Sequence, residues 1–137
     1  MTDQSSLRRM MVDTQVRPSD VTKYAIIEAM LSVPRENYVP DQARQTAYAD
    51  GNVPLIPGRT VLAPRTLAKM LDALDLRPDQ MALDLGCGLG YSTAVIARLS
   101  EAVVAVEEDS DMADEAARKA RMDFMSVEDL MRIANGG

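Results

Sequence analysis

The pattern of apolar and polar residues along this chain predicts a mixed α/β fold. Two short apolar runs, Met81–Leu85 and Ala102–Val106, have the length and continuity of strands that are buried on both faces of a parallel sheet. Between the runs, positions recur with the i, i+3, i+4, i+7 spacing of one helix face. These positions are Ser92, Val95, Ile96 and Leu99. The order strand, helix, strand predicts a two-strand parallel unit.

Helical periodicity, interrupted by prolines and glycines, marks the chain on both sides of this unit. Pro18 and Pro34 end the first two helices. The stretch 51–63 contains two prolines and two glycines, and it predicts a loop or a short edge strand. Near the end of the chain, Ser126 and Asp129 resemble a capping box. Three helices are expected before the loop, over 5–16, over 20–32 with Ser19 as its cap, and over 41–47. A fourth is expected over Pro64–Leu74, with Leu67, Met70, Leu71 and Leu74 on one face. Two more follow the second strand: one is capped by Ser110 and has a stripe of Ala113, Ala116, Ala117 and Ala120, and the last has Val127, Leu130, Met131 and Ala134 on one face.

The turn between the first strand and its helix is rich in glycine. It reads D-x-G-x-G-x-G, with the acid at Asp84 and the glycines at Gly86, Gly88 and Gly90. The dinucleotide-binding fingerprint is G-x-G-x-x-G, and its third glycine position is occupied by Tyr91 here. Glycine allows a sharp turn and lets a ligand approach bare main chain, so the turn is a candidate site for a nucleotide-type ligand. The alternative is a tight turn with no ligand.

Two acidic residues follow the second strand. Glu107 lies 21 residues after Gly86, and in dinucleotide-binding folds an acid at about that distance bonds the ribose hydroxyls. Glu107 is therefore the candidate ribose ligand. The side chain of Glu108 is expected to be exposed to solvent at the end of the strand and to bind no ligand.

Composition narrows the classes of function. The chain has 137 residues, enough for one domain with a core, and a net charge of −6, which argues against non-specific binding to nucleic acid. It has one cysteine and no histidine, so an intrachain disulfide and a zinc site of the usual kind are excluded. There is no apolar run of membrane-spanning length and no apolar signal core near residue 1. We therefore expect a cytoplasmic protein with no metal, membrane or nucleic-acid partner.

The glycine motif resembles the first motif of class I S-adenosylmethionine-dependent methyltransferases. Longer stretches, AMLSVPRENYVP (29–40), AYADGNVPLIPGRTVLAPRTLAKMLDAL (47–74) and ALDLGCGLGYSTAVIARL (82–99), resemble the N-terminal half of protein-L-isoaspartate O-methyltransferases, in family order over about residues 8–120. The resemblance implies an α/β, truncated Rossmann-like methyltransferase fold with a helical N-terminal extension. It also implies S-adenosyl-L-methionine as cofactor and an isoaspartyl carboxylate of a protein or peptide as methyl acceptor. The implied cofactor-binding residues are Asp84, Gly86, Gly88, Gly90 and Glu107.

For Asp84 the resemblance implies a supporting role near the methionine amino group or the turn amides. The other interpretation is a structural acid that accepts bonds from backbone amides where the helix begins.

Two departures from the family pattern bear on activity. The loop 60–64 is implied to close over the active site and typically reads T-[IV]-S-x-P, but Leu62 stands in the serine position, which leaves Thr60 as the one candidate catalytic hydroxyl. The chain also has no further strand-like run after Val106. The expected parts are an extension with the loop (1–63), half of the methyltransferase domain (64–120) and a helical tail (121–137).

A two-strand parallel unit exposes both of its edges. The chain is then a fragment, a truncated gene product or a protein that completes its core through a partner, and we expect a homo-oligomer or a chain that is completed by a partner. The alternative function is a non-catalytic, methyltransferase-like module that binds a protein partner.

Overall fold

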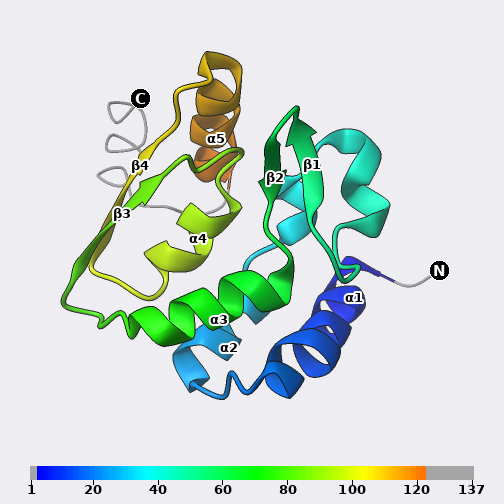
Figure 1. Ribbon diagram of the computed structural model, residues 1–137, viewed down its shortest axis with the longest axis vertical. Helices are drawn as coiled ribbons and strands as arrows, with labels where there is room; N and C mark the ends of the chain where they lie inside the picture. Colours follow the sequence, from blue (N-terminus) through cyan, green and yellow to red (C-terminus); the bar gives the residue numbers. More distant parts are fainter. Residues whose placement is uncertain (1–2, 123–137) are drawn as a thin grey trace. The chain divides into compact units, whose positions relative to one another are not determined.

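The computed structural model describes residues 3–122. The chain divides into two compact units, Met1–Leu76 and Arg77–Gly137. Figure 1 shows the elements of both. The division falls after helix α3 (Pro64–Leu74), because α3 packs on helical elements of the first unit. It therefore differs from the boundary that the sequence predicts between residues 63 and 64.

The first unit is helical apart from one antiparallel hairpin. Pro57 and Gly58 lie between the two hairpin strands, and Gly58 has a φ of +81°. The core of the unit is formed by apolar side chains from the helices, including Met11, Met30 and Leu67. Its elements are α1 (Gln4–Met11), α2 (Tyr24–Ser32), α3, β1 (Val53–Ile56), β2 (Arg59–Val61), a π-helical turn η1 (Val12–Val16) and the 3₁₀ turns η2 (Arg17–Ser19), η3 (Arg35–Tyr38) and η4 (Asp41–Thr46).

Helix α2 begins later than the sequence predicts. Ser19 does not cap it, because its hydroxyl donates to the carbonyl of Gln15 at 2.7 Å. The next residue, Asp20, has a φ of +70°, a left-handed conformation that interrupts a right-handed helix. The chain therefore re-enters a helix at Tyr24.

Helix α3 has the predicted bounds but a rotated buried face. Leu67 and Leu71 are buried as predicted, whereas Met70 and Leu74 are 56% and 60% exposed. The observed buried set also has the i, i+3, i+4, i+7 spacing and starts three residues earlier. Its members are Pro64, Leu67, Ala68 and Leu71.

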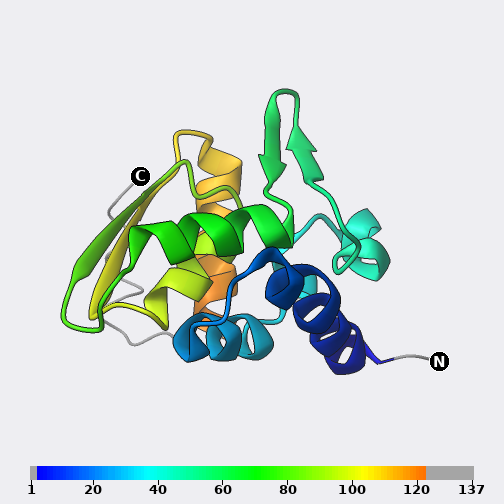
Figure 2. The same cartoon turned by 60° about the horizontal axis from the view of Figure 1, so that its bottom comes forward.

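The second unit is a strand–helix–strand unit followed by a helix. β3 (Met81–Leu85) and β4 (Ala102–Val106) run parallel, in register from Met81 opposite Ala102 to Leu85 opposite Val106. Helix α4 (Tyr91–Ala97) connects them, and α5 (Ser110–Met122) follows. Figure 2 shows α4 and α5 on the same side of the strand pair. The small core there contains Cys87, Ala105, Ala116, Ala117 and Ala120.

The prediction that both strands are buried on both faces is wrong for β3. Met81, Leu83 and Leu85 are 62%, 61% and 70% exposed. They project from the face opposite Ala82 and Asp84. An apolar run in the sequence predicts a strand, but it does not show whether a helix covers each face of that strand.

Helix α5 begins at the predicted place with a different cap. The side chain of Asp109, not Ser110, accepts the bond from the amide of Met112 at 3.0 Å. The predicted capping box at Ser126 and the helix over 127–134 lie outside the described residues. Within residues 3–122, no helix combines the length and the apolar character that crossing a membrane requires.

Candidate functional site

The glycine turn lies where β3 and β4 end. Gly86, Gly88 and Gly90 have φ angles of +73°, +60° and +99°. Residues with a Cβ atom are strained in this left-handed region, so the backbone path itself requires glycine. The amide of Gly86 donates to the carbonyl of Val106 at 2.7 Å, which ties the turn to the end of β4. Carboxyl ends of parallel strands are where open α/β sheets bind ligands.

Asp84 connects the end of β3 to the start of α4. Its Oδ2 accepts hydrogen bonds from the hydroxyls of Ser92 and Thr93, both at 2.7 Å. The partners are therefore side-chain hydroxyls and not the backbone amides of the structural interpretation. Its Oδ1 accepts no hydrogen bond from the described residues, and the side chain is half-buried. One oxygen thus holds the helix, and the other is available to a donor.

Glu107 is buried beneath the glycine turn, with 3% of its surface exposed. Its Oε1 accepts from the amide of Gly88 at 2.8 Å, and its Oε2 accepts from the amide of Asp109 at 2.9 Å. The carboxylate thus fixes the turn to the end of β4. The ribose role of Glu107 stays a prediction. Glu108 is exposed.

The structure thus brings together the five predicted cofactor residues at one end of the parallel strands. Sequence reasoning did not identify Thr93 or Asp109 as part of this arrangement, and it took Ser92 only as a position on the helix face. The available signal was the pair of hydroxyl residues Ser92 and Thr93, which Tyr91 separates from the last glycine. Among the described residues, no group of three or more candidate ligands could hold a metal ion.

Thr60 belongs to the other compact unit. It is exposed on β2, opposite Pro54. The backbone that follows is held by Arg35, which is fully buried and donates to the carbonyls of Ala47 at 2.6 Å and Leu62 at 3.1 Å. Arg35 therefore fixes both ends of the segment that contains the hairpin.

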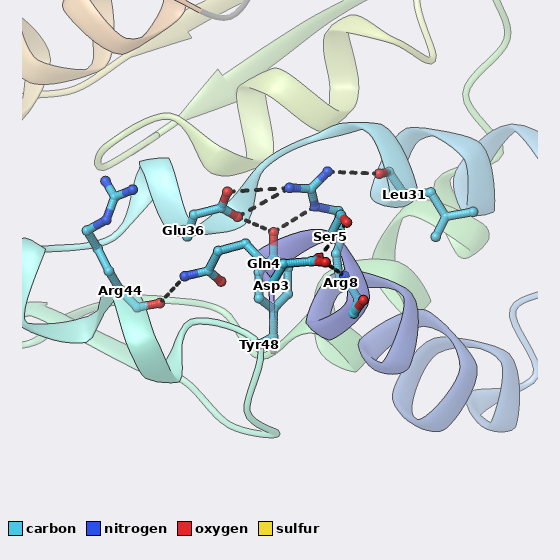
Figure 3. Close-up of polar contacts among 9 residues, drawn as sticks. Asp3, Gln4, Ser5, Arg8, Leu31, Glu36, Arg44 and Tyr48 are labelled. Carbon is cyan, nitrogen blue, oxygen red and sulfur yellow. Dashed lines mark hydrogen bonds and ion pairs between the residues drawn. The ribbon is translucent and has the colours of Figure 1, made fainter. Parts of the chain in front are cut away.

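A buried polar cluster lies beside this segment in the first unit. Figure 3 shows the guanidinium of Arg8 between Leu31, Glu36 and Tyr48. It donates to the hydroxyl of Tyr48 at 2.7 Å, and that hydroxyl donates to Glu36. Burial, and then the hydrogen bond to Glu36, hold the pKa of Tyr48 above its usual value, so the hydroxyl keeps its proton. With its charges paired, the cluster is structural.

Cys87 lies inside the glycine turn and is buried. Burial raises the pKa of its thiol to about 11 from an ordinary 9.0, and the negative charges of Asp84 and Glu107 act in the same direction. The thiol is therefore neutral at physiological pH.

Alkylation of Cys87 by iodoacetamide at pH 8 is expected to be roughly a hundredfold slower in the folded chain than in the urea-unfolded chain. The thiolate is the reactive form, and the raised pKa depletes it. The reaction reports one site, because the chain has a single cysteine. The folded-state rate should keep rising with pH up to about 11. Equal rates in the two states would contradict the buried, proton-bearing thiol.

The two parallel strands, the glycine turn and the connecting helix form a strand–turn–helix–strand unit of the Rossmann-like type. A profile of the protein-L-isoaspartate(D-aspartate) O-methyltransferase family matches residues 7–136. The chain belongs to this family. The match extends the resemblance beyond residue 120, where the sequence alone had placed its end.

Individual relatives agree with this assignment. A protein-L-isoaspartate O-methyltransferase of Methylorubrum extorquens is 39% identical over 134 residues, which are 98% of this chain and 58% of the relative. One of Marinobacter nauticus is 40% identical over 83% of this chain and 52% of the relative. A solved structure is also similar: a Plasmodium falciparum protein described as a putative protein-L-isoaspartate O-methyltransferase, crystallised in complex with S-adenosyl-L-homocysteine. The two structures superpose with a TM-score of 0.71 at 25% sequence identity, over 90% of this chain and 57% of the Plasmodium chain. The chain spans about half to three-fifths of the length of these proteins.

Proposed function

We propose that this chain carries the S-adenosyl-L-methionine-binding half of a protein-L-isoaspartate O-methyltransferase. The observation that supports this most strongly is the D-x-G-x-G-x-G turn, whose three glycines are all left-handed and whose central amide is held by a buried acid. The solved relative described above was crystallised with S-adenosyl-L-homocysteine, the product left when the cofactor has given up its methyl group.

The residues of the turn fit such a ligand. Gly86 is exposed and has no side chain, which allows a ligand to approach its main chain closely. Asp84 offers an oxygen without a partner among the described residues to a donor such as an ammonium group. Glu107, at the end of β4, is the acid that we propose for the ribose hydroxyls. When bound, the cofactor supplies an electrophilic sulfonium methyl group, and the role of this chain's residues is to hold and orient it.

The methyl acceptor we propose is the carboxylate of an isoaspartyl residue in a protein or peptide, in the cytoplasm. Methyl transfer depends mainly on alignment of the two reactants. Thr60 is the candidate hydroxyl for positioning that carboxylate, because Leu62 has an apolar side chain where the family pattern has serine.

A non-catalytic module that binds a protein partner is the second candidate. Two observations favour it. Leu62 removes a hydroxyl from the loop, and β3 has an exposed apolar face. The two candidates differ in whether the turn binds the cofactor.

A titration followed by heteronuclear NMR tests the cofactor assignment residue by residue. On addition of S-adenosyl-L-methionine, the amide resonances of Gly86, Gly88 and Gly90 are expected to shift. The amide resonances of Gly51 and Gly58 serve as controls, because these glycines also have positive φ angles but lie in the first unit. Their chemical shifts are expected not to change. A folded sample in which none of the five resonances moves would refute the cofactor site and favour the second candidate.

Replacing Glu107 by alanine is expected to lower the free energy of unfolding by roughly 1–3 kcal/mol, because two amides lose their acceptor. The affinity for S-adenosyl-L-methionine is expected to fall by a similar amount. Glu108→Ala is the matched control, since this neighbour is exposed and its loss should change stability by less than about 0.5 kcal/mol. Urea unfolding and equilibrium dialysis measure the two quantities, and equal effects of the two substitutions would contradict the role of Glu107.

A further inference from the structure

A chemically labile pair of residues precedes the β1–β2 hairpin of the first unit (Figure 1). Asp50 and Gly51 are the one aspartate–glycine pair in the sequence, and they lie in a loop outside any helix or strand. The side chain of Asp50 is 52% exposed. A Cβ atom added at Gly51 would meet nothing within 4 Å, so there is open space beside its main chain. Both residues are therefore accessible to each other and to water.

An aspartate–glycine pair in such a loop rearranges without an enzyme. The amide nitrogen of the glycine attacks the carboxyl carbon of the aspartate side chain, and a carbon–nitrogen bond closes a five-membered succinimide ring. The amide proton and the carboxyl hydroxyl leave as one water molecule. Water then adds to either ring carbonyl, one carbon–nitrogen bond breaks, and the product is aspartate or isoaspartate.

Two features of Gly51 favour closure of this ring. Glycine has no side chain to obstruct the attack of its own amide nitrogen. The amide of Gly51 also donates no hydrogen bond to any of the described residues, so the nucleophile is not held elsewhere.

Arg65 holds the carboxylate of Asp50 in the folded chain. It is the second residue of α3, and its Nε and Nη2 donate to Oδ1 and Oδ2 of Asp50 at 3.0 Å and 2.5 Å. A two-point contact of this kind fixes the orientation of the carboxylate as well as its position. Ring closure removes one carboxyl oxygen as water, so at least one of the two bonds to Arg65 must break before the ring can form.

We propose that Asp50–Gly51 is a site of spontaneous isomerisation and that Arg65 slows the reaction in the folded chain. Isoaspartate adds one carbon atom to the main chain and carries its carboxylate directly on Cα, so the contact with Arg65 is expected to be lost. The change falls beside Asn52, whose side-chain oxygen accepts from the amide of Ala63 at 2.8 Å and joins the two ends of the hairpin segment. The proposal goes beyond the proposed function and does not depend on the cofactor.

Peptide mapping after incubation tests the site. The folded chain is kept for weeks in mildly acidic buffer, below its unfolding transition, and fragmentation of its peptides by electron transfer then distinguishes isoaspartate from aspartate. We expect isoaspartate at Asp50 and a much lower yield at Asp79, which is 80% exposed in a turn but is followed by Gln80. The peptide with Asn135–Gly136, which lies outside the described residues, is scored separately. Equal yields at Asp50 and Asp79 would overturn the proposal.

Arg65→Gln tests the restraint. An exposed ion pair contributes little to stability, so we expect isoaspartate at Asp50 to form roughly two- to fivefold faster in this variant. Arg17→Gln is the matched control, because it breaks a similarly exposed pair with Asp13 and should leave the rate at Asp50 unchanged.

The urea-unfolded chain supplies the remaining comparison. Without the folded contact, the unmodified chain and Arg65→Gln are expected to form isoaspartate at Asp50 at equal rates. Equal folded-state rates for Arg65→Gln and Arg17→Gln would show that Arg65 does not restrain the reaction. An acceleration by Arg65→Gln that persists after unfolding would also overturn the proposal, because it would not arise from the folded contact.

Discussion

Incubated with radiolabelled S-adenosyl-L-methionine and an isoaspartyl peptide, this chain alone is expected to transfer methyl groups roughly a hundredfold or more slowly than a full-length relative, if it does so at all. Catalysis of this kind requires close alignment of the reactants, and small misplacements cost about two orders of magnitude. Here the loop has Leu62 in the serine position, and the apolar face of β3 is exposed. The full-length Methylorubrum extorquens relative, assayed in parallel, is the reference.

Leu62→Ser separates the two causes of this loss. A hydrogen bond to a charged group is worth about 1.5–3 kcal/mol, so if the leucine alone limited the reaction, restoring serine would raise the rate by roughly 10- to 100-fold. Because β3 remains uncovered in this variant, we expect a gain of less than tenfold. Turnover by the unmodified chain comparable to that of the reference would show that the half-sheet is sufficient for catalysis.

Gly88→Val is expected to abolish detectable binding of S-adenosyl-L-methionine. Gly88 has a φ of +60° and is buried, and its amide donates to Glu107. A branched side chain in this conformation costs on the order of 1–3 kcal/mol, and at a buried position it would also distort the turn that Glu107 holds. A loss of affinity of roughly a hundredfold or more is therefore expected in equilibrium dialysis.

Gly58→Val is the matched control for this substitution. Gly58 also has a positive φ, +81°, but it lies in the hairpin, and a Cβ there would meet nothing within 4 Å. The backbone strain is thus comparable, but it falls in the hairpin of the first unit and not in the glycine turn. Unchanged affinity of a folded Gly88→Val variant, or an equal loss in Gly58→Val, would contradict the role of the glycine turn.

The elements of the second unit could be predicted from the sequence because their signals are local. Apolar runs set the bounds of β3 and β4, and a glycine turn leads into α4. In the first unit, Pro64 at the start of α3 and the left-handed Asp75 after it set that helix's bounds. Each of these signals acts within a few residues of the boundary that it determines.

What the sequence could not predict depends on contacts between distant residues. The rotated face of α3 follows from what it packs against, since two sets of positions with the same spacing compete within eleven residues. The exposed face of β3 follows from the absence of a covering element within the described residues. The partners of Glu107 are two backbone amides, and backbone amides are present at every non-proline position, so no residue type signals them.

The central claim is that this chain binds S-adenosyl-L-methionine through the glycine turn. Titration calorimetry of the 137-residue chain, at two temperatures because binding enthalpy varies with temperature, tests it most directly. The sample must first show a cooperative unfolding transition. We predict saturable binding at a single site, lost in Gly88→Val and retained in Gly58→Val. A folded chain that gives no binding heat at either temperature would contradict the claim and leave the protein-binding module as the function.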